Sequence, residues 1–156
     1  MLPLEDALAQ MLHQLPFPTK TETLALTEAA DRVCAEDVIS PINVPSFDNS
    51  AMDGYAVRLA DLQQSMTLSV AGKSFAGNPF QGEWVAQSAV RIMTGAMIPE
   101  GADAVVMQEE VTVNEDGTVT FAALPKANQN IRRIGEDVKK GDVVLHCLLY
   151  TSDAAD

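Results

Sequence analysis

The sequence has few aromatic residues, few cysteines and no long apolar run. Phe, Trp and Tyr make up only 5% of its 156 residues, so a core would consist mainly of aliphatic side chains. Cys34 and Cys147 show neither a metal-type spacing nor a disulfide framework. No stretch approaches the roughly 18 consecutive apolar residues of a membrane helix, and no basic segment precedes an apolar run as in a secretory signal. We therefore expect a cytoplasmic protein that does not enter membranes.

Positively charged residues are also scarce. The chain has 10 Lys and Arg residues against 22 Asp and Glu residues, which gives a formal net charge of −12. Such an acidic surface repels phosphate backbones and anionic lipid headgroups, which argues against nucleic acids and membranes as partners. The close basic pairs, Arg132–Arg133 and Lys139–Lys140, could hold a small anion but are too few to follow a nucleic acid. Apolar residues, at 47%, suffice for one ordinary domain or two small ones.

Apolar periodicity predicts one amphipathic helix over residues 3–15, followed by short strands. The apolar face of the helix consists of Leu4, Leu8, Met11, Leu12 and Leu15. A strand is expected at residues 24–26, a brief helix at 28–31 and a strand at 33–39. Short apolar runs separated by glycines predict the other strands, at residues 68–70, 89–93, 104–107, 111–113, 119–121 and 143–145. The turn residues 114–117 predict a hairpin between two of these strands.

Residues 46–57 read as a polar loop that carries two carboxylates. Asp48 and Asp53 lie five residues apart, with polar residues and Gly54 beside them. Carboxylate oxygens suit a hard cation such as Mg²⁺, and a carboxylate pair could instead act as acid and base, as in a hydrolase. The alternative without a ligand is a turn in which Asp48 and Asn49 hydrogen-bond their own backbone. The spacing alone leaves these interpretations open.

Two further segments place polar groups beside glycines. Thr94 and Gly95 end an expected strand, where a hydroxyl and free backbone amides could contact an anion; an ordinary turn is the alternative. Residues 130–137 place Arg132, Arg133 and two acids around one glycine, and arginine can bind phosphate or carboxylate with two parallel hydrogen bonds. The alternative there is a solvated loop with internal ion pairs, which would contribute little stability.

Taken together, these segments resemble one family closely. Motifs of the molybdopterin molybdenumtransferases are similar, in the same order, to residues 45–57, 71–77, 91–96, 99–106 and 130–137. The resemblance runs from residue 3 to about residue 145 and corresponds to the first part of a full family member. Residues 147–156 do not continue it and look like a non-native tail, so Cys147 carries no information.

The resemblance implies an α+β, β-rich fold. An elongated domain of one helix and short strands would comprise residues 1–45 and 126–146. A small β-rich domain, residues 46–125 including the 46–57 loop, would be inserted into it. The family's C-terminal pterin-binding domain would be absent from this chain. Because that domain supplies the molybdate pocket and most nucleotide contacts, the chain alone is expected to be inactive.

The resemblance also implies a function in molybdenum cofactor biosynthesis. Family members insert molybdenum from molybdate into adenylyl-molybdopterin and release AMP with the help of Mg²⁺. They are homodimers, and their cleft lies between the β-rich domain of one subunit and the pterin-binding domain of the other. The alternative is a non-catalytic dimerisation or scaffolding module of the same fold, because related animal domains anchor membrane receptors.

Three residues match functional positions of the family motifs. Asp53 matches the acid of Met-Asp-Gly, Thr94 the threonine of Met-Thr-Gly and Asp137 the acid of Gly-Glu-Asp, so these are the expected catalytic residues. Asp53 and Asp137 would control charge or position metal and phosphate, and we expect them to converge beside Thr94. The expected substrate-binding residues are Asp48, Asn49, Ser50, Gly95, Arg132 and Arg133. The resemblance assigns no direct metal ligand.

Overall fold

The computed structural model describes residues 3–14 and 20–147, and the chain divides into two compact units. The first unit, residues 1–38 and 145–156, contains the helix α1 (Leu4–Gln14) and the 3-10 helix η1 (Leu26–Glu28). The second unit, residues 39–144, contains the main sheet and every candidate site residue. The boundaries between the units fall within β1 (Val38–Ile39) and β10 (Val143–Leu145).

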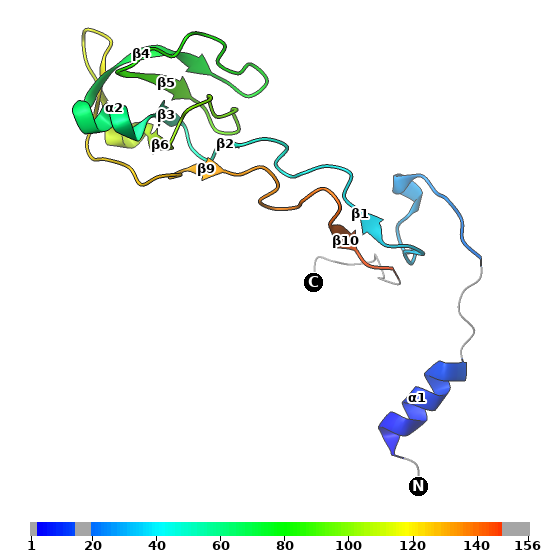
Figure 1. Ribbon diagram of the computed structural model, residues 1–156. Coiled ribbons are helices and arrows are strands. Elements are labelled where there is room, and N and C mark those ends of the chain that lie inside the picture. The colour runs from blue at the N-terminus through cyan, green and yellow to red at the C-terminus, as the bar shows by residue number, and fades with distance from the viewer. Residues whose placement is uncertain (1–2, 15–19, 148–156) are drawn as a thin grey trace. The chain divides into compact units, whose positions relative to one another are not determined.

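Six strands form the sheet of the second unit, in the order β6-β3-β5-β4-β8-β7. Figure 1 labels β3, β4, β5 and β6 of this sheet. Their bounds are Gly54–Val57 for β3, Thr67–Ser74 for β4, Ser88–Ile92 for β5, Ala104–Met107 for β6, Val111–Val113 for β7 and Val119–Phe121 for β8. β4 and β5 run parallel, and the other neighbouring pairs run antiparallel. The 3-10 helix η2 (Gln108–Glu110) connects β6 to β7.

The centre of this sheet is buried on both faces. Successive side chains of a strand point to opposite faces, so Tyr55 and Val57 of β3 join one apolar cluster while Ala56 joins the other. The helix α2 (Leu59–Gln64), which follows β3, adds Leu62 to the first cluster. β3 therefore lies in the middle of the core, and the residues that precede it are attached to a well-packed sheet.

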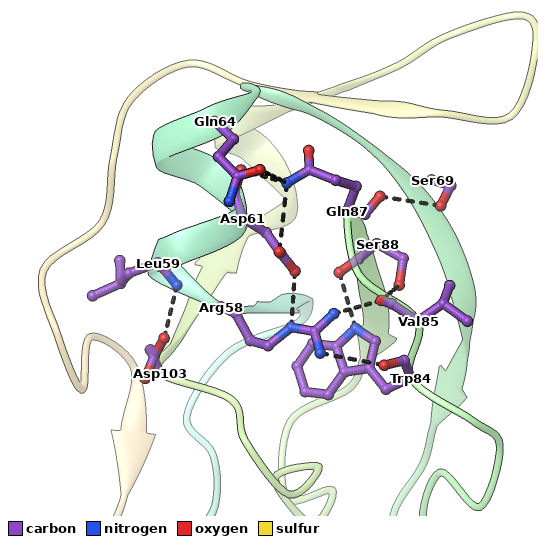
Figure 2. A network of polar contacts seen from close by, with 10 residues as sticks. All are labelled: Arg58, Leu59, Asp61, Gln64, Ser69, Trp84, Val85, Gln87, Ser88 and Asp103. Atoms are coloured by element: carbon purple, nitrogen blue, oxygen red, sulfur yellow. Dashed lines mark hydrogen bonds and ion pairs between the residues drawn. The ribbon is translucent and has the colours of Figure 1, made fainter.

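A polar network holds α2 against the segment that precedes β5 (Figure 2). Arg58 donates from Nε to Asp61 Oδ2 at 2.8 Å and from Nη1 to the Trp84 carbonyl at 3.2 Å. The Arg58 Cζ also lies 4.6 Å from the centre of the Trp84 ring, and the indole N–H donates to the Ser88 carbonyl at 2.9 Å. A charge over an aromatic face adds to the attraction between these segments. None of these contacts involves a candidate site residue.

The predictions for the β-rich part are confirmed in most elements. β6, β7, β8 and β10 have the predicted bounds, and β7 pairs with β8 as the predicted hairpin. β4 and β5 overlap the predicted strands. The predicted helix is present as α1, and its last apolar position, Leu15, lies outside the described residues. One dominant sheet with few helices is the expected α+β, β-rich class.

Other predictions are wrong. Residues 24–26 form no strand, and η1 replaces the helix predicted at residues 28–31. The strand predicted at residues 33–39 is limited to Val38–Ile39. The segment 46–57 is not a continuous loop, because it contains β2 (Asn49–Ser50) and β3. All four residues of β3 are buried, so the alternation that reveals a half-buried strand is missing from its sequence. Helix α2 was not predicted.

The segment after β8 returns beside the segment before β3 (Figure 1). β2 pairs antiparallel with β9 (Ile131–Arg132), and the Val44 amide donates to the Val138 carbonyl at 2.7 Å. These pairings join residues 39–45 and 126–144 to the unit that contains the sheet. The compact units therefore divide at residues 38/39 and 144/145, whereas the predicted domain boundaries were 45/46 and 125/126. The family-based division into an extended and an inserted domain stays a prediction.

Candidate functional site

Asp53 and Thr94 lie together at one edge of the sheet. Asp53 directly precedes β3, and Thr94 follows β5 by two residues. Since β3 and β5 are antiparallel neighbours with Gly54 opposite Ile92, the start of one strand lies beside the end of the other. Asp53 Oδ1 accepts hydrogen bonds from both the backbone amide and the hydroxyl of Thr94, each at 2.7 Å.

These two hydrogen bonds favour the ionised form of Asp53. The Thr94 amide, followed by the Thr94 hydroxyl, holds the pKa of the Asp53 carboxyl below its usual range, and the positive charge of Arg91 acts in the same direction. Asp53 is half-buried and Thr94 is exposed. The pair therefore presents a carboxylate of fixed orientation to solvent at neutral pH.

Two glycines allow the close strand approach and the turn conformation of the backbone around Asp53 and Thr94. A β-carbon on Gly54 would lie 1.9 Å from the Val106 carbonyl oxygen, so another residue would force β3 away from β6. Gly95 has a φ of +77°, a conformation that residues with a β-carbon rarely adopt, and its amide donates to the Ser50 carbonyl at 2.8 Å. The Thr94–Gly95 turn is thereby joined to β2.

Asn49 and Ser50 are buried, at 8% and 1% exposure, and their side chains donate hydrogen bonds to nearby backbone carbonyls. Asn49 Nδ2 donates to the Phe47 carbonyl at 3.2 Å, and Ser50 Oγ donates to the Met52 carbonyl at 2.5 Å. The Ser50 amide donates to the Ala96 carbonyl. In this arrangement both residues hold the turn that leads to Asp53.

Asp48 belongs to a separate network with the return segment. Its Oδ1 accepts a hydrogen bond from the Ile134 amide at 2.7 Å, and its Oδ2 pairs with the Arg133 guanidinium. The Ile134 amide, together with Arg133, lowers the pKa of the Asp48 carboxyl. Since Asp48 is engaged in this way and shows no contact with Asp53 in the described part of the chain, the arrangement does not favour a carboxylate pair of the hydrolase type.

Asp137 pairs with Arg132 rather than with Asp53 or Thr94. Both oxygens of Asp137 accept hydrogen bonds from Nη2 of Arg132, and this pairing raises the pKa of the Arg132 guanidinium. Within residues 3–14 and 20–147, no hydrogen bond or ion pair joins Asp137 to either Asp53 or Thr94. β2 lies between the two networks, because Asn49 is opposite Arg132 while Ser50 contacts the Thr94–Gly95 turn.

Acidification provides a test of the Asp48 network. The pKa of Asp48 is lowered in the folded chain relative to about 3.9 in an unfolded chain. Its stabilisation is therefore fully present well above pH 4 and is lost as the pH falls below that value. We expect Asp48→Asn to lower the free energy of unfolding at pH 7 and to have a smaller effect at pH 3, as measured by urea unfolding followed by Trp84 fluorescence. An effect of Asp48→Asn that is equally large at both pH values would contradict this account.

The carboxylates do not form a complete metal site. Among the described residues, no group of three or more His, Cys, Asp or Glu side chains could hold a metal ion. Asp53 Oδ2 accepts no hydrogen bond from this part of the chain, since both Thr94 donors bind Oδ1. Mg²⁺ often takes only one or two protein carboxylates, with water and substrate phosphates as its other ligands. Asp53 fits a magnesium ion of that kind.

The sequence predicted no role for Arg91 or for Gln108, whose backbone amide donates to the Asp53 carbonyl at 3.0 Å and whose Oε1 accepts a hydrogen bond from Arg91. Arg91 lies within the motif of residues 91–96, but nothing in the local pattern links it to Asp53. The link becomes visible only through strand pairing, because Arg91 is opposite Tyr55, two residues after Asp53.

Comparison with known proteins shows one family. The family described as "MoeA N-terminal region (domain I and II)" matches residues 2–147. The molybdopterin molybdenumtransferase of Haemophilus influenzae is 81% identical over 145 residues, which are 93% of this chain and 36% of that protein. The Bacillus subtilis protein of the same name is 38% identical over 152 residues, with coverage of 92% and 35%. The chain thus spans about a third of the length of these curated relatives.

Solved structures agree with this assignment. The crystal structure of the molybdopterin biosynthesis moeA protein from Pyrococcus horikoshii OT3 superposes with a TM-score of 0.77 at 37% identity, covering 97% of this chain and 41% of the other. Another crystal structure, of the molybdopterin biosynthesis moea protein from Pyrococcus horikosii, gives a TM-score of 0.74 at 31% identity, covering 94% of this chain and 38% of the other. Among the described residues, neither α1 nor α2 is long and apolar enough to cross a membrane.

Proposed function

Since the chain belongs to the MoeA N-terminal family, we propose that it is the N-terminal portion of a molybdopterin molybdenumtransferase. The full-length protein would work in the cytoplasm, insert molybdenum from molybdate into adenylyl-molybdopterin and release AMP. The observation that carries this proposal is the motif residue Asp53, which Thr94 holds in a fixed orientation beside the Thr94–Gly95 turn. The identity of 81% to the Haemophilus influenzae relative supports the same activity.

In this proposal, Asp53 contributes a negative charge at the reaction cleft. Thr94 lowers the pKa of the Asp53 carboxyl and binds Oδ1 with both of its donors, which leaves Oδ2 for a ligand. Asp53 would hold a magnesium ion together with phosphate oxygens of the substrate, and the bound ion would neutralise phosphate charge. The buried Asn49 and Ser50 maintain the position of the turn.

The Arg132–Asp137 pair would supply a second contact to the substrate. Both side chains remain accessible, at 40% and 48% exposure. An ion pair exposed to this degree contributes little stability. A phosphate group of the substrate could therefore displace Asp137 from Arg132 at low energetic cost, while Arg133 remains engaged with Asp48.

The active form would be a homodimer. The apolar side chains Leu4, Leu8, Met11 and Leu12 of α1 are between 49% and 76% exposed. A helix with an apolar stripe of this kind is normally covered by another element or another chain. The apolar face of α1 supports a larger assembly, and the family resemblance supports a homodimer.

Activity should require the remainder of the protein. We expect purified residues 1–146 to show no AMP release from adenylyl-molybdopterin in the presence of molybdate and Mg²⁺. A hybrid protein, in which these residues replace the matching region of the Haemophilus influenzae relative, should release AMP and form the molybdenum-loaded pterin. The measurement is chromatographic detection of AMP. Full-rate release by residues 1–146 alone would refute the requirement, and an inactive but folded hybrid would refute the proposed function.

A further inference from the structure

The guanidinium of Arg91 connects three parts of the chain around Asp53. Nη1 donates to the Gly54 carbonyl at 2.9 Å, and Nη2 donates to Gln108 Oε1. The Arg91 Cζ lies 5.0 Å from the centre of the Tyr55 ring, which is attractive for a cation over an aromatic face. Arg91 thus binds the carbonyl of the residue directly after Asp53.

Gln108 contacts both Arg91 and the backbone of Asp53. Its backbone amide donates to the Asp53 carbonyl at 3.0 Å, and its side chain accepts the hydrogen bond from Arg91. The carbonyls of Asp53 and Gly54 are therefore held by Gln108 and Arg91, respectively. Two successive carbonyls fixed in this way define the backbone from which the Asp53 side chain extends.

Arg91 and Thr94 come from the same segment, the end of β5 and the turn after it. Thr94 binds the Asp53 carboxylate, while Arg91 binds the carbonyl of Gly54, the residue that follows Asp53. The two contacts are mutually dependent, because a shift of the Gly54 peptide would move Oδ1 relative to both Thr94 donors. Displacements of about 1 Å can lower a reaction rate about 10²-fold.

We propose that Arg91, together with Gln108, is a positioning residue that fixes the Asp53 carboxylate for the transfer reaction. This inference rests on the proposed function in one respect, namely that Asp53 acts in catalysis. Neither Arg91 nor Gln108 needs to contact the substrate. Their effect acts through the orientation of Asp53 and through the strength of its hydrogen bonds to Thr94.

The first part of the experiment measures turnover in the hybrid protein. Arg91→Met keeps an aliphatic stem over Tyr55 but removes both donors, and Gln108→Met removes the acceptor for Arg91. We expect Arg91→Met to lower kcat about tenfold or more with KM nearly unchanged, and Gln108→Met to lower it less. Gln108→Glu retains an acceptor oxygen and should restore most of the activity that Gln108→Met loses.

Arg58→Met is the matched control. Arg58 also lies over an aromatic ring, donates to backbone carbonyls and anchors the segment that precedes β5 (Figure 2). It has no contact with Asp53 or Thr94 in the described structure. We expect Arg58→Met to lose about as much stability as Arg91→Met, while its kcat per folded molecule stays unchanged.

The second part measures the titration of Asp53 by carboxyl carbon NMR in the 156-residue chain. Gln108→Met removes no charge, so a rise in the pKa of Asp53 in this variant would report weaker hydrogen bonds to Thr94. We expect such a rise in Gln108→Met and a larger one in Arg91→Met, but none in Arg58→Met.

The proposed positioning role of Arg91 and Gln108 is overturned if kcat per folded molecule and the pKa of Asp53 both stay unchanged in Arg91→Met and Gln108→Met. If Arg91→Met does not fold, Gln108→Met alone decides in the same way. An inactive unmodified hybrid would end the proposed function, whereas the titration would still show whether Arg91 and Gln108 orient Asp53.

Discussion

Asp53→Asn in the hybrid protein is expected to lower kcat about 10²-fold or more, with the fold retained. Asparagine keeps an oxygen that accepts both hydrogen bonds from Thr94, so the turn before β3 should persist. The substitution removes the negative charge, which in our proposal holds the magnesium ion that neutralises the phosphate groups of the substrate. The measurements are steady-state AMP release and, for the fold, circular dichroism and urea unfolding.

Asp116→Asn is the matched control for this charge removal. Asp116 Oδ1 accepts hydrogen bonds from the Thr118 amide at 3.0 Å and from the Thr118 hydroxyl at 2.7 Å, and these lower the pKa of its carboxyl. The same pair of donors thus binds both aspartates, but Asp116 lies in the turn between β7 and β8. We expect its kcat to equal that of the unmodified hybrid. Equal losses in both variants would assign the effect to general charge or stability rather than to the site.

Gly54→Ala is expected to lower the free energy of unfolding of the chain by about 3 kcal/mol. The added β-carbon would lie 1.9 Å from the Val106 carbonyl oxygen, a backbone atom in the neighbouring strand β6. A backbone atom cannot turn away as a flexible side chain can, so the strands must separate in the middle of the core. Urea unfolding followed by the fluorescence of Trp84, the single tryptophan, measures the change.

Gly77→Ala separates this steric effect from the general effect of replacing glycine. Gly77 has a φ of +75°, and a β-carbon there would meet no atom within 4 Å. We expect a loss of about 1–2 kcal/mol, which reflects backbone conformation alone. If Gly54→Ala destabilises the chain no more than Gly77→Ala, then β3 and β6 do not approach each other as closely as the structure shows.

The elements that were predicted correctly have signals contained within a few residues. The hairpin of β7 and β8 has apolar strands on both sides of a turn with Gly117, whose φ is +82°. β6 is a short apolar run next to glycine and proline residues. β3 was missed because it is buried on both faces and shows no alternation. Its identity as a strand depends on β5 and β6, which are distant in the sequence.

The sequence by itself determined the family, through several motifs in a fixed order, and most of the strands, because turn residues and apolar runs act locally. Only the tertiary structure decided which motif residues share a network. Asp53 contacts Thr94, Asp48 contacts Arg133, and Asp137 contacts Arg132. Hydrogen bonds and ion pairs depend on which strands are neighbours, on their register and on the direction of each side chain. These are properties of the packed sheet and the paired return segment, so no local pattern of residues contains them.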